Sequence, residues 1–67
     1  MKVRDVIRLV EQDGWYFVAQ RGSHRQYRHP VEPGRVTVAG KPGDEMAPGT
    51  LGSIFRQAGV GREEGRR

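Results

Sequence analysis

The chain contains no cysteine among its 67 residues. This absence excludes disulfide bonds, cysteine-based zinc sites and thiol nucleophiles. Long hydrophobic runs are missing too: ionised residues interrupt the opening segment MKVRDVIRLV, where a signal peptide needs an unbroken apolar stretch. No later segment approaches membrane-spanning length. We therefore expect a soluble, cytoplasmic protein that makes no membrane contact and folds by side-chain packing alone.

Negative charge is scarce as well. Twelve Lys and Arg stand against eight Asp and Glu, which gives a formal net charge of +4. A basic protein of this kind suits a polyanionic partner. A chain this short buries only about 60% of the surface that its unfolded form exposes, so we expect a thin core and no deep enclosed active site.

Apolar residues at helical spacing predict two helices, one near each end of the chain. The first set is Val3, Val6, Ile7 and Val10, in a helix that Gly14 can end. The second set is Leu51, Ile54, Phe55 and Ala58, in a helix that begins with Pro48 and ends at Gly59.

Three strands are predicted between these helices, over residues 15–20, 24–29 and 35–39. A tight turn at Gly22-Ser23 makes the first two an antiparallel hairpin, and Pro33-Gly34 reverses the chain again. Residues 40–49 read as a flexible connection. The predicted class is therefore α+β, in the order helix-strand-strand-strand-helix. Both helices must cover one face of the antiparallel sheet, which leaves the other face open.

His24, directly after the turn, is the residue best suited to chemistry, although a histidine there is often only an exposed strand residue. A metal site is not supported, because the only other histidine is His29 and side chains five residues apart along a strand face opposite sides. General acid or base catalysis on RNA is supported, because imidazole can move protons near neutral pH. We expect no metal and no cofactor.

Cationic residues lie on both sides of His24 along the chain. Arg21, Arg25 and Arg28 are candidate phosphate ligands, since guanidinium groups stabilise charge that develops on phosphorus-bound oxygens. A two-residue turn would pair Arg21 with His24 across the hairpin and point Arg25 to the other face of the sheet. A bulge would reverse the faces assigned to Arg21 and Arg25. Ser23 is disfavoured as a nucleophile, because the hairpin holds no acid to orient His24 as its base. Either a wider phosphate-binding surface or a solvated basic face would account for Arg35, Lys41 and Arg56.

Three aromatic residues and an acidic pair complete the candidates. Trp15, Tyr16 and Tyr27 are expected in the core or over the sheet, with at most one free to stack on an RNA base. Asp44 and Glu45 are interpreted as charges at the start of the second helix, because paired catalytic carboxylates need a defined separation across a cleft.

Together these segments resemble the HicA-type mRNA interferase toxins, which are paired with HicB-type antitoxins. The resemblance is carried by KVRDVIRLVEQDGW, GSHRQYRHP, RVTVAGKPGDE and APGTLGSIFRQAG. It implies a small fold similar to double-stranded RNA-binding domains and metal-independent cleavage of mRNA. It also implies that His24 occupies the catalytic position, flanked by the family's Gly22 and Ser23.

Two positions depart from the family pattern. Lys41 stands where many relatives carry a second histidine, and lysine is a poor proton shuttle at neutral pH although its charge suits phosphate. Ala19 stands where a basic residue is common. The residues and the resemblance together predict a catalytic His24 and an RNA surface made of Arg21, Ser23, Arg25, Arg28 and Lys41.

Our leading hypothesis is the toxin of a type II toxin-antitoxin system, an endoribonuclease whose His24 face binds mRNA and is covered by a HicB-type antitoxin. The alternative is a weakly active or inactive module that binds RNA or a partner. A basic surface that mainly serves an acidic partner protein is a third interpretation. Residues 1–59 are expected to form the toxin domain, and residues 60–67 a flexible tail.

Overall fold

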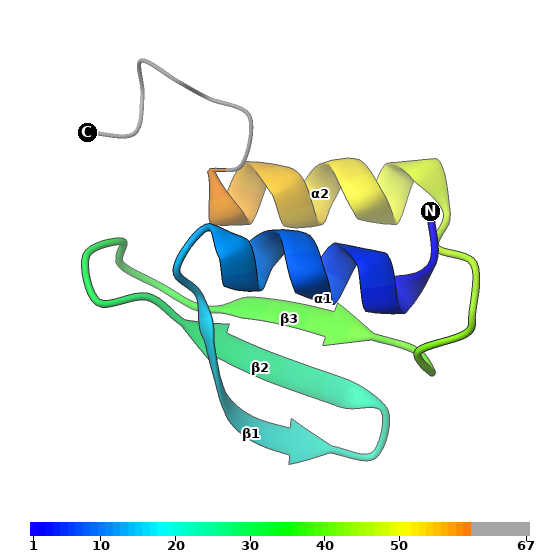
Figure 1. Ribbon diagram of the computed structural model, residues 1–67, viewed down its shortest axis with the longest axis horizontal. Helices are drawn as coiled ribbons and strands as arrows, with labels where there is room; N and C mark the ends of the chain where they lie inside the picture. Colours follow the sequence, from blue (N-terminus) through cyan, green and yellow to red (C-terminus); the bar gives the residue numbers. More distant parts are fainter. Residues whose placement is uncertain (60–67) are drawn as a thin grey trace.

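Five elements follow one another in the predicted order in a computed structural model that describes residues 1–59. They are α1 (Val3–Gln12), β1 (Tyr16–Arg21), β2 (His24–Arg28), β3 (Val36–Ala39) and α2 (Pro48–Ala58) (Figure 1). The predicted α+β class is confirmed, and the arrangement is that of a double-stranded RNA-binding domain. The predicted tail, 60–67, lies outside the described residues.

The sheet is antiparallel with the strand order β1-β2-β3. Its hairpin turn is Gly22-Ser23, and the glycine takes the left-handed conformation that such a turn needs, with φ of 56°. Arg21 and His24 are therefore directly opposite each other, as a two-residue turn requires. The register shifts once, between Phe17 and Ala19, where β1 bulges.

Both helices lie on one side of the sheet, as predicted, and both pack on β3, whereas β1 is the strand farthest from them (Figure 1). The core fills the space between the helices and the sheet. It consists of Val3, Val6, Val10, Trp15, Tyr27, Val36, Val38, Met46, Ile54 and Ala58. The indole Nε1 of Trp15 donates a buried hydrogen bond of 3.2 Å to the carbonyl of Ala58, which joins the start of β1 to the end of α2.

The start of α1 is capped by backbone from a distant part of the chain. No side chain caps this helix. Instead, the backbone N–H of Val3 donates to the carbonyl of Asp44 at 2.9 Å, and that of Arg4 donates to the carbonyl of Pro42 at 3.0 Å. Two of the N–H groups that a helix leaves unpaired are thereby satisfied. The segment after β3 is thus fixed to α1 by hydrogen bonds.

Within residues 1–59, neither helix has the length and apolar character needed to cross a lipid bilayer.

Candidate functional site

His24 is the first residue of β2 and is exposed. Its strand partners are Arg21 on β1 and Ala39 on β3. Since side chains alternate along a strand, the buried Tyr27 shows which side of β2 meets the helices. Arg25 shares that side, and His24 faces the opposite one.

The open face is the side of the sheet turned away from the helices. Alternation and register assign to it Tyr16, Ala19 and Arg21 from β1, His24, Gln26 and Arg28 from β2, and Thr37 and Ala39 from β3. Arg35, just before β3, joins this face, because its Nη1 donates a hydrogen bond of 2.6 Å to Oε1 of Gln26. His24 therefore lies at one end of a surface that carries three arginines.

The positive charge of the open face is not neutralised by the ion pairs within residues 1–59. Those pairs join the N-terminal amine to Glu45, Lys2 to Glu45, and Arg8 to Asp5, all at α1 or the loop beside it. Among the arginines of the open face, Arg21 is the nearest to His24. Arg28 lies four residues further along β2, which corresponds to about 13 Å.

Arg25 is separated from the other predicted phosphate ligands. It faces the helix side of the sheet, is half-buried, and its Nη1 donates a hydrogen bond of 3.1 Å to the carbonyl of Gly40. This contact ties β2 to the end of β3. The structure therefore supports a structural role for Arg25 and gives no support to a shared site with His24.

Ser23 and Lys41 lie at the same end of the sheet as His24. Ser23 is exposed in the hairpin turn, and its carbonyl accepts a hydrogen bond of 3.1 Å from the N–H of Gly40. Lys41 comes next in the chain and is exposed too. The backbone thus brings the turn, His24 and Lys41 to one edge of the open face.

His29 has a different environment from His24. Its Nδ1 accepts hydrogen bonds from the backbone N–H groups of Val31 (3.0 Å) and Glu32 (3.1 Å). The proton must therefore sit on Nε2, which donates to the carbonyl of Asp13 at 2.9 Å. The ring also meets the edge of Trp15, with centroids 5.2 Å apart. His29 joins the ends of α1 and β2, and the described residues contain no group of three potential metal ligands.

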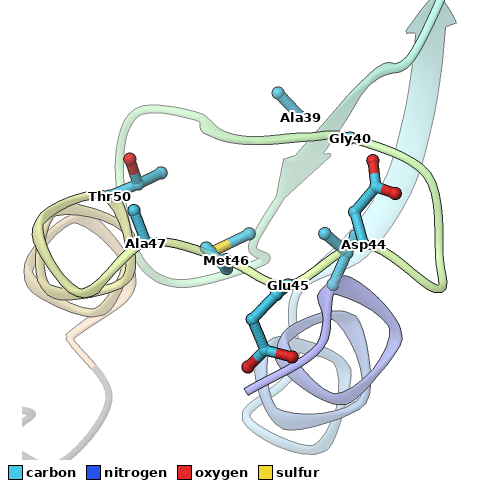
Figure 2. Close-up of a pocket in the computed structure, with 8 residues that line it drawn as sticks. Ala39, Gly40, Asp44, Glu45, Met46, Ala47 and Thr50 are labelled. Carbon is cyan, nitrogen blue, oxygen red and sulfur yellow. The ribbon is translucent and has the colours of Figure 1, made fainter.

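A groove of about 270 Å³ opens where the end of β3 meets the starts of α1 and α2. It is lined by Val3, Ala39, Gly40, Asp44, Glu45, Met46, Ala47 and Thr50 (Figure 2). The interpretation of Asp44 and Glu45 as charges at the start of the second helix is wrong, because α2 begins only at Pro48 and its first turn holds no acidic residue. Oδ2 of Asp44 accepts a hydrogen bond of 3.1 Å from the N–H of Lys41. Oε2 of Glu45 accepts one from the N-terminal amine, which lowers the pKa of the Glu45 carboxyl.

The aromatic residues divide as predicted. Trp15 and Tyr27 are each only 2% exposed, whereas Tyr16 is 50% exposed and lies on the open face. Desolvation by burial raises the pKa of the Tyr27 phenol, and the negative charge of Glu11 adds to the effect.

Gln26, whose Oε1 accepts the hydrogen bond from Arg35, was not predicted from the sequence as a site residue, because its role depends on a neighbour nine residues away across the sheet.

Comparison with known proteins gives one family. A model described as the HicA toxin of bacterial toxin-antitoxin systems matches residues 3–60. No curated protein matches the chain.

Proposed function

The chain belongs to the HicA toxin family of toxin-antitoxin systems, and we propose that it is an endoribonuclease that cleaves mRNA, with His24 as general acid or base. The observation that carries the proposal is the position of His24, exposed at the end of the open face and directly opposite Arg21. A cytoplasmic location follows from the substrate, since mRNA is translated there.

The proposed reaction needs no group beyond the RNA and the protein. The 2′-oxygen attacks the adjacent phosphorus and the bond from phosphorus to the 5′-oxygen breaks, leaving a 2′,3′-cyclic phosphate and a 5′-hydroxyl. One proton leaves the 2′-hydroxyl and another reaches the 5′-oxygen. Imidazole suits either transfer, because its ordinary pKa lies close to neutral pH.

The arginines of the open face supply the charge that this reaction requires. Arg21 faces the same side as His24 from the neighbouring strand, so its guanidinium can stabilise the negative charge on the phosphorus-bound oxygens. Arg28 and Arg35 lie further along and would hold flanking phosphates. Ser23 and Lys41 border the His24 end, and Tyr16 offers an exposed ring on which a base can stack.

Membership of a toxin-antitoxin family implies an antitoxin partner. We propose that a HicB-type antitoxin covers the open face around His24 and Arg21, because blocking the catalytic group and the phosphate ligands together would inhibit most efficiently. An acidic antitoxin surface would match the basic residues there. Hydrogen exchange with and without the antitoxin tests this: protection confined to the helix side would contradict it.

The central experiment compares the parent chain with His24→Ala in a cleavage assay on mRNA. Loss of a general acid or base lowers the rate by about 10² to 10⁴, so we expect cleavage to fall by this factor. Thr37→Ala is the control, since it shortens a neutral side chain on the same face. Equal cleavage by the parent and His24→Ala, at matched folded protein, would refute the catalytic role. RNA binding without cleavage by either would instead indicate a binding module.

A further inference from the structure

The groove between β3, α1 and α2 begins beside the proposed catalytic residue. Ala39, which lines the groove, is the β3 partner of His24. Neighbouring strands lie about 4.8 Å apart, and β3 is an edge strand of the sheet. The core residues Val3 and Met46 place the groove on the helix side, so it lies around the edge of β3 from the open face that carries His24. An RNA strand with its scissile phosphate at His24 would bring a neighbouring nucleotide to the mouth of the groove by passing around the edge of β3.

The lining combines apolar residues with three polar ones, Asp44, Glu45 and Thr50. Met46 is only 7% exposed and, together with Val3, forms the floor. Asp44 and Thr50 stand on opposite sides of the opening (Figure 2). A flat ring with polar edges fits such a lining, because its faces contact carbon and its edge reaches hydrogen-bonding groups.

We propose that this groove binds the base of a nucleotide next to the scissile phosphate, and that Asp44 selects bases carrying an exocyclic amino group over uracil. The inference rests on the proposed ribonuclease function and adds a specificity determinant to it. Carboxylates accept hydrogen bonds from base amino groups, as in the pairing of Asp or Glu with N4 of cytosine. Where cytosine carries its N4 amino donor, uracil carries the O4 acceptor, which a carboxylate does not bind.

Two features of Asp44 suit a recognition role. One oxygen, Oδ2, already accepts the N–H of Lys41, which fixes the orientation of the carboxylate. An ionised carboxylate has about four acceptor positions, so capacity remains for a ligand. A phosphate is a poor candidate for this groove, because the negative charge of Asp44 would repel it.

The neighbouring acid provides a matched control. Glu45 carries the same charge, but its carboxylate points away from the opening towards the N-terminal amine (Figure 2). Asp44→Asn keeps an oxygen for the N–H of Lys41 and adds an amide donor. Glu45→Gln makes the same change of charge one residue away, at a lining residue whose carboxylate is directed away from the opening.

The test measures kcat/KM for short RNAs that differ only in the base on either side of the cleaved bond. For the parent chain we expect amino-bearing bases to be preferred over uracil by roughly 5- to 20-fold at one position. Asp44→Asn should remove most of this preference, and Glu45→Gln should retain it. Equal preference in the parent and Asp44→Asn would overturn the inference and leave the ribonuclease function intact.

A second measurement separates the two proposals if the parent cleaves nothing, which would refute the ribonuclease function. Cytidine and uridine 3′-monophosphates are titrated while amide and methyl NMR signals of Met46, Ala47 and Thr50 are followed. Shifts with the cytidine nucleotide that exceed those with the uridine nucleotide, and that vanish in Asp44→Asn, support the base site. Absence of shifts with either nucleotide would refute it.

Discussion

At the scale of single residues, the two histidines show how differently the same side chain is used. His24 is exposed on the open face, where a substrate can reach its imidazole. His29 is half-buried, and both of its ring nitrogens make hydrogen bonds to backbone. One histidine is accessible from solvent, and the other joins the ends of α1 and β2.

This difference predicts opposite effects on stability. His29→Ala leaves the carbonyl of Asp13 and two backbone N–H groups without their present partner, so we expect the free energy of unfolding to fall by about 1 to 3 kcal/mol. His24→Ala should change it by no more than about 0.5 kcal/mol, as for other exposed substitutions. Urea denaturation measures both, and equal losses in the two variants would contradict the assignment.

Tyr27 predicts how stability changes at alkaline pH. Burial raises the pKa of its phenol above the ordinary value of 10.0. The unfolded chain therefore loses this proton at lower pH than the folded chain does. The corresponding stability is present below pH 10 and is lost as the pH rises through the folded-state pKa. Tyr27→Phe removes the titrating group and should flatten this decline.

Denaturation between pH 8 and pH 11 tests the expectation, and Tyr16→Phe is the control because that ring is half exposed. The parent and Tyr16→Phe should lose stability with similar slopes, and Tyr27→Phe with a shallower one. A decline in Tyr27→Phe as steep as in the parent would show that other groups cause it.

At the scale of elements, the sequence predicts those features that depend only on residues close together along the chain. Apolar spacing located both helices, and the Gly-Ser pair located the hairpin turn and so the opposition of Arg21 and His24. The predicted and observed strand ends differ by one residue. The first strand excludes Trp15, whose indole Nε1 instead donates a hydrogen bond to the carbonyl of Ala58 at the end of α2. The bulge in β1 and the capping of α1 by loop carbonyls depend on distant contacts, which local patterns do not encode.

The loop after β3 yields a prediction about Gly40. Its φ is 107°, and a Cβ there would approach Cγ2 of Val3 to 3.2 Å. Gly40→Ala therefore combines backbone strain with crowding against the core, and we expect it to cost about 1 to 3 kcal/mol of unfolding free energy. Gly43→Ala is the matched control in the same loop, since its Cβ would meet only Arg4 Nη1 at 4.0 Å.

Thermal unfolding compares the two variants. A clear fall in Tm for Gly40→Ala with little change for Gly43→Ala is the expected result. If both variants had the same Tm as the parent, the loop would not need the left-handed conformation at Gly40.

At the scale of the whole molecule, charge and architecture divide the sheet into two sides. The helices bury one side, and the other carries Arg21, Arg28 and Arg35 with no acid paired to them among residues 1–59. Sequence reasoning identified the basic residues near His24, since they are neighbours along the chain. It could not decide between the faces for Arg25, because that depends on the turn length and the register.

The two sides predict different salt dependence of RNA binding for two arginines that lie only four residues apart. In a His24→Ala background, which permits binding without cleavage, each contact to single-stranded phosphate contributes about 0.7 to the slope of log affinity against log salt. Arg21→Gln should reduce the slope by about this amount, because Arg21 lies on the open face. Arg25→Gln removes the same charge from the helix side, where the guanidinium donates to the carbonyl of Gly40, so it should leave the slope unchanged while lowering stability. Equal reductions of the slope in both variants would mean that RNA binding depends on net charge alone. Such a result would contradict the assignment of the open face as the RNA-binding surface.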